Sequence, residues 1–232
     1  MLILQLIFRL TGIPALLLHF YYRTIFAKKR FRLPKGSLII SNHTAFMDIV
    51  AIGLVWPFRV MRYVAARMLY GKSSAFAWFL RHMGAIAAGR DGADLSPISE
   101  SIRLLNEGKT VTIFPEGRIS NNGELLPFLS GAATIAVKTD ATIVPMYQHG
   151  ERGFFKKGVT VVGEPFKLSE MYDLSNLTSD DIFEINDLFM AKISSLKEAI
   201  PQKVLDKSAA FVAKQRARRI KKFGTDDKVR MW

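Results

Sequence analysis

The sequence predicts an α/β fold: one layered domain in which a mixed, largely parallel sheet is flanked by helices. Three observations support this fold. Short runs of β-branched and apolar residues alternate with segments of helical periodicity. The length of 232 residues suits one domain with appended helices. Two strand-like runs end in polar turns, as strands do where open α/β sheets bind ligands.

The expected elements follow one another closely along the chain. The strands are expected at 37–41, 62–66, 85–88, 110–114, 142–147 and 159–162. The helices between them are expected at 46–55, 74–82, 95–106 and 131–138. The clearest pattern is that of 95–106, where Ile98, Ile102 and Leu105 recur at three- and four-residue spacing and Gly108 follows as a stop signal.

The pattern becomes helical after Pro165. Ser179 or Asp180 is expected to cap a helix that runs to about residue 199 and that Pro201 ends. A last, basic helix is expected over about 203–222. It is either a second element on a membrane surface or an exposed basic helix.

The net charge of +13 is concentrated in the two ends. Residues 1–35 carry seven cations and no acid, and residues 201–232 carry ten cations and three acids. The middle, 36–200, is nearly neutral with 16 cations and 17 acids. This division predicts a basic, membrane-associating helical segment, a globular domain, and a basic C-terminal helix and tail. The partner is then a polyanion or an anionic membrane, unless the charges are merely solvated.

The N-terminal sequence favours a membrane over a nucleic acid. Residues 2–26 are almost entirely apolar or aromatic, which DNA or RNA binding does not explain. Only 13 residues separate Arg9 from Arg23, fewer than the about 20 that a membrane span needs, and Pro14 interrupts a single helix. We therefore expect one or two helices in the lipid interface, with the cations at 28–32 reaching lipid phosphates. A buried core helix is the alternative, whereas a cleaved signal peptide does not fit the order of charges.

Several kinds of chemistry are excluded by composition. The chain has no cysteine, so it has no disulfide, Cys-ligated metal or thiol nucleophile. The four histidines show no HExxH spacing, and no metal is predicted. Without a GxSxG elbow, Ser41, Ser120 and Ser130 are poor candidates for a serine nucleophile.

The first candidate site is a His–Asp pair after the strand at 37–41. His43 and Asp48 are five residues apart, so they would point away from each other within one helix. They meet only if His43 lies in a turn and Asp48 lies at the start of the next helix, with Ser41, Asn42 and Thr44 as capping residues. The carboxylate would then fix the imidazole tautomer and leave the other ring nitrogen as a general base. A capping turn without catalysis is the alternative.

A second polar turn follows the strand at 110–114. Glu116 and Arg118 flank Gly117, so that a guanidinium and backbone N–H groups can converge on an anion such as phosphate. A surface Glu–Arg pair is the alternative interpretation. Arg90 is a further candidate, because it follows another strand-like run and Gly89.

Together these boxes resemble the glycerolipid acyltransferase family. Residues 42–48 (NHTAFMD) match its NHxxxxD box, and Gly84 with Arg90 matches its GxxxxxR box. Residues 114–120 (FPEGRIS) match the FPEG box, with Arg118 one place earlier than in the commonest form, and residues 143–146 match the IVP box. The boxes occur in the family's order and spacing, and the sequence resembles bacterial-type lysophosphatidate acyltransferases.

The resemblance implies a reaction and a location. An acyl chain would pass from acyl-carrier protein or acyl-coenzyme A to the free hydroxyl of lysophosphatidate, giving phosphatidate in phospholipid synthesis. The thioester is then a co-substrate, and no cofactor or metal is needed. The enzyme would work at the cytoplasmic face of the inner membrane, held there by its N-terminal segment, and residues 36–200 would form the acyltransferase domain.

The resemblance also implies a role for each site residue. His43 would be the general base and Asp48 its orienting carboxylate. Arg118 would hold the acceptor phosphate with Arg90 and the backbone near Gly117. Glu116 belongs to the same phosphate-binding set, where it would orient the arginine or a glycerol hydroxyl.

Other functions stay open at this point. A different acceptor is one alternative: glycerol-3-phosphate, lysophosphatidylethanolamine or an amino-acid lipid. A basic protein without catalysis, bound to a membrane or a nucleic acid, is the alternative from another class.

Overall fold

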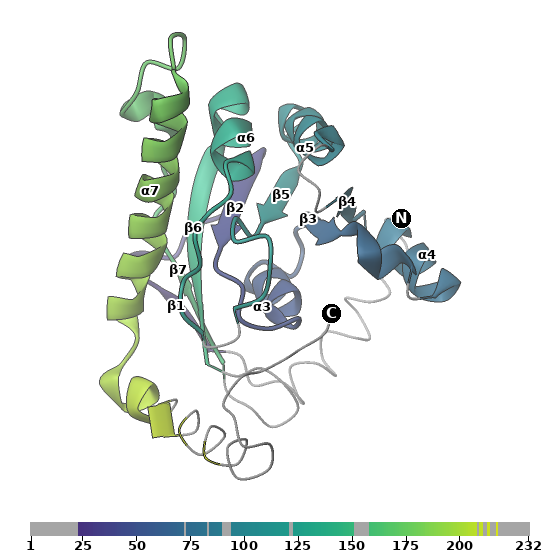
Figure 1. The fold of residues 1–232 in the computed structure, drawn as a ribbon. Helices are drawn as coiled ribbons and strands as arrows, with labels where there is room; N and C mark the ends of the chain where they lie inside the picture. The colour runs from purple at the N-terminus through teal and green to yellow at the C-terminus, as the bar shows by residue number, and fades with distance from the viewer. Residues whose placement is uncertain are drawn as a thin grey trace.

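The fold is built on a seven-stranded sheet. The computed structural model describes residues 23–71, 73–82, 84–89, 94–120, 123–150 and 158–207, with 209, 210, 213 and 217. The strand order is β1-β7-β6-β2-β5-β3-β4 (Figure 1). The strands are β1 (Arg23–Phe26), β2 (Ser37–Ser41), β3 (Met61–Ala66), β4 (Ile86–Ala88), β5 (Thr110–Ile113), β6 (Thr142–His149) and β7 (Val159–Val162). Only the β6–β7 pair among these strands is antiparallel, which confirms the mixed, largely parallel sheet.

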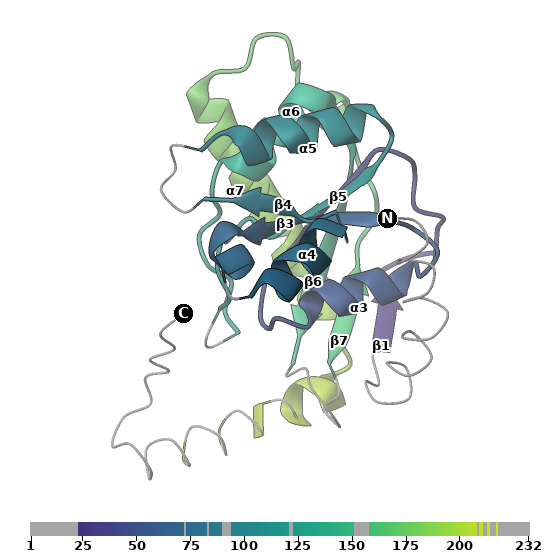
Figure 2. The ribbon, with the colours of Figure 1, turned by 90° about the vertical axis from the view of Figure 1, so that its right-hand side faces the viewer.

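Helices cover both faces of the sheet. They are α3 (Asp48–Val55), α4 (Ser74–His82), α5 (Ser96–Asn106), α6 (Gly131–Thr139) and α7 (Ser179–Ser195), with the short 3-10 helices η2 (Arg67–Gly71), η3 (Leu168–Glu170) and η4 (Leu196–Ala199). Helices α5, α6 and α7 lie on one face, and α3 and α4 lie on the other (Figures 1 and 2). The layered α/β prediction is confirmed.

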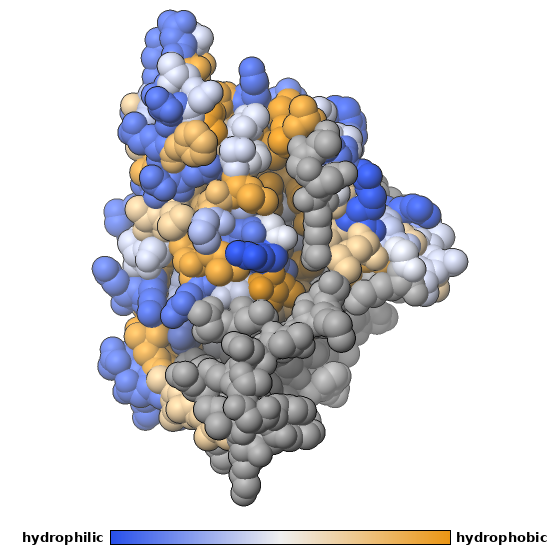
Figure 3. Space-filling model, viewed as in Figure 1, coloured by the Kyte–Doolittle hydropathy of each residue, from blue (hydrophilic) through white to orange (hydrophobic). Residues whose placement is uncertain are grey.

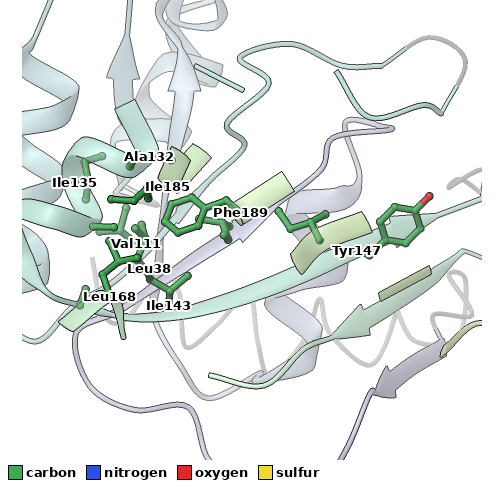
Figure 4. Packing of buried hydrophobic residues seen from close by; sticks show 14 of the residues in the cluster. Leu38, Val111, Ala132, Ile135, Ile143, Tyr147, Leu168, Ile185 and Phe189 are labelled. Atoms are coloured by element: carbon green, nitrogen blue, oxygen red, sulfur yellow. The ribbon is translucent and has the colours of Figure 1, made fainter. Parts of the chain in front are cut away.

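Two cores follow from the alternation of side chains along the strands. On β2, Leu38 and Ile40 face the cluster under α5, α6 and α7, where Phe189 is one of the largest buried side chains (Figure 4). Ile39 points the opposite way, into the cluster under α3 with Ile52. Because both faces are covered, β2 is a continuous apolar run rather than an alternating one.

The structure corrects the sequence analysis at the start of the chain. Residues 23–26 lie within the predicted membrane-associating helical segment 1–35, but they form the edge strand β1 and pair in parallel with β7. The chain after β1 packs on the domain: Lys28 pairs with Glu164 at 2.6 Å, and Leu33 is buried. This segment forms a strand and not a helix because β7 offers an open edge for pairing, which the local periodicity of the sequence does not reveal.

The predictions for the two ends fall largely outside the described residues. Residues 1–22 are not among them, so the expected interfacial helices there stay a prediction. Within the described residues, no helix has both the length and the apolar character needed to cross a membrane. Near the other end, residues 202–207 are helical, which agrees with the first part of the predicted basic helix. The division of the chain into three segments also stays a prediction.

Candidate active site

His43 and Asp48 meet at the carboxyl end of β2, as the sequence predicts. His43 lies in the turn after β2, and Asp48 is the first residue of α3. The distance from His43 Nδ1 to Asp48 Oδ2 is 3.0 Å. The Asp48 side chain is fully buried, whereas the His43 side chain is 14% exposed. The imidazole is therefore held through Nδ1, and Nε2 is the nitrogen left for a substrate.

Asp48 also organises the turn that carries His43. Its Oδ2 accepts hydrogen bonds from the backbone N–H of Thr44 at 2.7 Å and of Ala45 at 2.8 Å. The predicted capping by Ser41, Asn42 and Thr44 is wrong, because Met47 is the N-cap residue of α3 and no side chain caps the helix. One buried carboxylate thus fixes both the imidazole and the backbone beneath it.

The Asn42 side chain instead clamps the catalytic turn to β6. Its Nδ2 donates to Gln148 O at 3.0 Å, and the Gln148 N–H donates to Asn42 Oδ1 at 2.6 Å. The Gln148 side chain then donates to Ser41 Oγ and accepts from Thr160 Oγ1. These residues are fully or almost fully buried, so each satisfied polar atom helps to fix the turn in one place.

Phe114 supports the other side of the imidazole. Its ring lies parallel to that of His43, with 4.0 Å between centroids and 15° between planes. The stack limits rotation of the His43 ring in a way that the hydrogen bond to Asp48 alone does not. Sequence reasoning missed this role, although Phe114 is the first residue of the FPEG box.

Glu116 connects the second turn to the first. Its Oε1 accepts from the His43 backbone N–H at 2.9 Å, and its Oε2 accepts from the Leu126 N–H at 3.2 Å. The side chain is buried, and the Ser120 N–H also donates to His43 O at 2.7 Å. Both carboxylate oxygens of Glu116 thus accept from backbone donors within the protein, and its predicted place in the phosphate-binding set stays a prediction.

Burial makes this carboxyl group a weaker acid than an ordinary glutamate side chain. Loss of hydration raises the pKa of Glu116 from 4.5 to about 7, and the nearby charge of Asp48 adds to the rise. The hydrogen bonds from His43 and Leu126 and the charge of Arg118 act in the opposite direction. The folded chain therefore holds the Glu116 proton more tightly than the unfolded chain does.

This pKa predicts a pH dependence of stability that Glu116→Gln removes. Because the folded-state pKa is raised, the contribution of Glu116 to stability is fully present below about 4.5 and is lost as the pH rises through about 7. The wild-type chain should lose roughly 3 kcal/mol more than Glu116→Gln between about pH 4 and about pH 8. Urea unfolding at both pH values measures this difference, with the exposed Glu198→Gln as a matched control. If the free energy of unfolding changed with pH in the same way for the wild type and for Glu116→Gln, the raised pKa of Glu116 would be contradicted.

Gly117 and Arg118 form the exposed part of the same turn. Gly117 has a φ of +63°, a backbone conformation that strains any residue with a side chain, and a Cβ there would lie 2.7 Å from Leu129 Cδ1. Its N–H closes the turn on Phe114 O at 3.0 Å. Arg118 is exposed and makes no hydrogen bond or ion pair with the described residues, which leaves its guanidinium available to an anion. Arg90 lies outside the described residues.

Gly84 of the GxxxxxR box has a packing role. It has a φ of +73°, and a Cβ there would lie 1.7 Å from Arg62 Nη1, so the guanidinium packs directly on its backbone. Both residues line an open cavity of about 550 Å³ between β4 and α5, which includes none of the predicted site residues. Within the described part of the chain, no group of three or more His, Asp or Glu side chains is placed to hold a metal ion.

Comparisons with known proteins indicate the family of this chain. The model of the family described as Acyltransferase matches residues 24–149. A 1-acyl-sn-glycerol-3-phosphate acyltransferase of Bacillus subtilis is 28% identical over 186 residues, which cover 78% of this chain and 85% of that protein. The alpha form from Mus musculus is 31% identical over 121 residues, covering 52% of this chain but only 42% of the mouse protein.

The fold has a solved counterpart as well. The crystal structure of the 1-acyl-sn-glycerophosphate acyltransferase from Thermotoga maritima superposes with a TM-score of 0.61 at 19% identity, covering 84% of this chain and 78% of that one. At this identity the likeness concerns the fold alone. The family model, however, spans more than half of the chain and includes both turns of the site. This chain therefore belongs to the Acyltransferase family and is an O-acyltransferase.

Proposed function

We propose that this enzyme transfers an acyl chain from a thioester to the free hydroxyl of lysophosphatidate, giving phosphatidate. The single observation that carries the proposal is the pair of adjoining turns. One turn presents His43 with Asp48, whose Oδ2 lies 3.0 Å from His43 Nδ1, and the other turn presents the exposed Arg118 guanidinium. A base for a hydroxyl and a cation for a phosphate are what this acceptor requires. The names of the bacterial and mammalian relatives, which are 1-acyl-sn-glycerol-3-phosphate acyltransferases, support the same acceptor.

The geometry suggests a direct transfer without an acyl-enzyme. His43 Nε2 takes the proton of the acceptor hydroxyl as its oxygen attacks the thioester carbonyl carbon. Asp48, bound to Nδ1, stabilises the imidazolium that forms. When the tetrahedral intermediate collapses, the carbon–sulfur bond breaks and the imidazolium returns its proton to the departing thiolate. The products are an ester and a free thiol, and no cofactor beyond the thioester co-substrate takes part.

A panel assay tests the acceptor and the donor together. Purified protein is given lysophosphatidate, glycerol-3-phosphate or lysophosphatidylethanolamine, each with acyl-carrier-protein and coenzyme A thioesters. The proposal expects lysophosphatidate to be acylated with the highest kcat/KM. A clear preference for another acceptor would contradict lysophosphatidate as the acceptor but not the acyl-transfer reaction itself. The identity of the thioester donor follows from the same panel.

Arg118→Ala is expected to raise the KM for lysophosphatidate about 10- to 100-fold, with little change in the KM of the donor. The reason is the loss of a charge-assisted hydrogen bond to phosphate, which is worth about 1.5–3 kcal/mol. Arg118→Lys should recover only part of the loss, because an ammonium lacks the two-pronged guanidinium geometry. Steady-state kinetics with each substrate varied in turn measures the effect. Arg81→Ala, at an exposed arginine on α4, is the matched control. Equal increases for both substrates would contradict a role specific to the acceptor.

We also propose that the enzyme works on the surface of an anionic phospholipid membrane, because its acceptor is an amphiphile. The sequence of residues 1–22 provides apolar area, and apolar area combined with positive charge usually gives firm binding to a membrane. A truncation that tests this segment has to stop before Arg23, since residues 23–26 belong to the sheet. Sedimentation with vesicles before and after that truncation measures the contribution of the segment. An unchanged pelleted fraction would argue against it.

A further inference from the structure

A buried row of polar side chains crosses the sheet beside the catalytic turn. Ser41, Gln148 and Thr160 lie on the neighbouring strands β2, β6 and β7 (Figure 1), and all three are fully buried. They face the α3 side of the sheet, because each is two residues away from a strand residue of the core under that helix. Hydrophilic side chains are typical of the surface, as over α7 in Figure 3, so a polar row inside an apolar layer requires partners.

Asn42 continues the sheet where β2 ends. The β2–β6 ladder stops at the pair of Ser41 with Met146. One residue later the Asn42 carboxamide bonds both main-chain groups of Gln148, donating at 3.0 Å and accepting at 2.6 Å. A side chain thus makes the two bonds that a further residue of a neighbouring strand would make. The chain can therefore turn away from the sheet at Asn42 and still be fixed to β6, directly before His43.

The Gln148 side chain extends this connection to β7. Both main-chain groups of Gln148 point toward β2, so its pair with Thr160 is of the close, non-hydrogen-bonded kind. Thr160 Oγ1 donates to Gln148 Oε1 at 2.8 Å, and Gln148 Nε2 donates to Ser41 Oγ at 3.2 Å. Ser41 Oγ donates in turn to Asn42 O at 3.1 Å. The hydrogen bonds therefore run in one direction, from Thr160 to the carbonyl group that precedes His43.

The peptide group between Asn42 and His43 is held at both of its polar atoms. Its carbonyl oxygen accepts from Ser41, and its N–H donates to Glu116 Oε1 at 2.9 Å. The two contacts come from opposite sides of β2, because Glu116 follows β5 and the chain of hydrogen bonds starts on β7. Rotation of this peptide would move the His43 ring away from Asp48, so its fixation bears directly on the base.

We propose that Gln148 and Thr160 are positioning residues for acyl transfer, because their side chains fix the Asn42–His43 peptide and with it His43 Nε2. Both side chains are fully buried, so they act through Ser41 and Asn42 and not on the substrate. A displacement of about 1 Å in a catalytic group can cost about 10²-fold in rate. The proposal rests on His43 as the base of the proposed function, but not on which acceptor the base deprotonates.

The test changes single buried side chains in the full chain at nearly constant volume. Thr160→Val removes the hydroxyl that donates to Gln148, and Thr160→Ser keeps it. Gln148→Met replaces the carboxamide by an apolar side chain of similar length. Thr112→Val is the matched control, because Thr112 is also fully buried on a strand and its Oγ1 makes no hydrogen bond with the described residues. Urea unfolding shows that each variant is folded under the assay conditions. The kcat and the KM are then measured with the acceptor that has the highest kcat/KM in the panel assay.

Thr160→Val is expected to lower kcat about tenfold and to change the KM of the acceptor less than about twofold, because the base is misplaced while the substrate-binding groups remain. Thr160→Ser should recover most of the loss, and Thr112→Val should change neither quantity. Gln148→Met should lower kcat about 10- to 100-fold. Adding Thr160→Val to Gln148→Met should then cost little more, since both residues act through one chain of hydrogen bonds.

Wild-type kcat in folded Thr160→Val would overturn the proposal, whether or not Gln148→Met folds. So would a loss that Thr160→Ser does not recover, since the hydroxyl would then not be its cause. Independent, multiplicative losses in the double variant would show that the two residues do not act together, and would also contradict it. Activity of His43→Ala would instead refute the proposed base, so failure of the proposed function is distinguishable from failure of this inference.

Discussion

Replacement of His43 by alanine is expected to lower kcat by about 10²–10⁴-fold, the usual effect of removing a general base. Nothing else among the described residues is placed to take the proton: Asp48 is fully buried behind the ring, and Glu116 has backbone donors on both carboxylate oxygens. Among the described residues, the side chain of His43 makes its hydrogen bond only to Asp48, so the turn itself should survive its removal. Steady-state kinetics on vesicle-embedded lysophosphatidate measures the loss.

His82→Ala is the matched control for this variant. His82 also stacks on an aromatic ring, that of Trp78 at 4.1 Å, and its Nδ1 lies 2.8 Å from Trp78 O. It lies on α4, away from both catalytic turns, so its loss should leave kcat unchanged. Near-full activity of His43→Ala would show that the proton is taken by another group, and the direct-transfer mechanism would be wrong.

The strands and helices inside the domain were predictable because their signals are local. Helix 74–82 and strands 37–41 and 159–162 are found with the predicted bounds. The other predicted elements are found with ends that differ by a few residues, as for α3, which starts at Asp48 and not at residue 46. The juxtaposition of His43 and Asp48 was also predictable, since five residues across a strand–helix junction leave one arrangement in which they meet.

What the sequence did not reveal depends on contacts between distant residues. Glu116 reaches the His43 backbone across 73 residues of chain, and Asn42 reaches Gln148 across 106. Neither contact leaves a repeating pattern in the sequence, so the sequence alone does not reveal that Glu116 has partners within the protein. The strand β1 was missed for a related reason: its four residues continue an apolar run, and only the open edge of β7 selects a strand.

The supporting contacts also give the residues of the FPEG box a physical meaning within this one chain. Phe114 stacks on the base, Glu116 holds the backbone of the base, and Gly117 makes room for Leu129. Phe114 and Glu116 thus support His43, whereas the exposed Arg118 makes no hydrogen bond or ion pair with the described residues. Because different residues of the turn have these two roles, a single turn can both position a base and offer a cation to a phosphate.

Asp48→Asn is expected to lower kcat about 10²-fold while leaving the stability of the fold nearly unchanged. Asp48 Oδ2 accepts from the Thr44 and Ala45 backbone N–H groups as well as from His43. These two donors require an oxygen at that place, so the asparagine carboxamide should lie with its oxygen toward them. The same oxygen then still accepts from His43 Nδ1, and the tautomer is kept. What is lost is the negative charge that stabilises the imidazolium, a difference of about 1.5–3 kcal/mol.

Asp48→Ala separates this electrostatic role from the structural one. It leaves the Thr44 and Ala45 N–H groups without their acceptor inside the protein, at a cost of about 1–3 kcal/mol for each. Urea unfolding should therefore show a clear loss of stability for Asp48→Ala and almost none for Asp48→Asn, whereas kcat should fall in both. Wild-type kcat in Asp48→Asn would mean that Asp48 serves only to hold the turn. A large loss of stability in Asp48→Asn would mean that the carboxamide cannot keep its oxygen toward the two backbone donors, and that the charge itself holds the turn together.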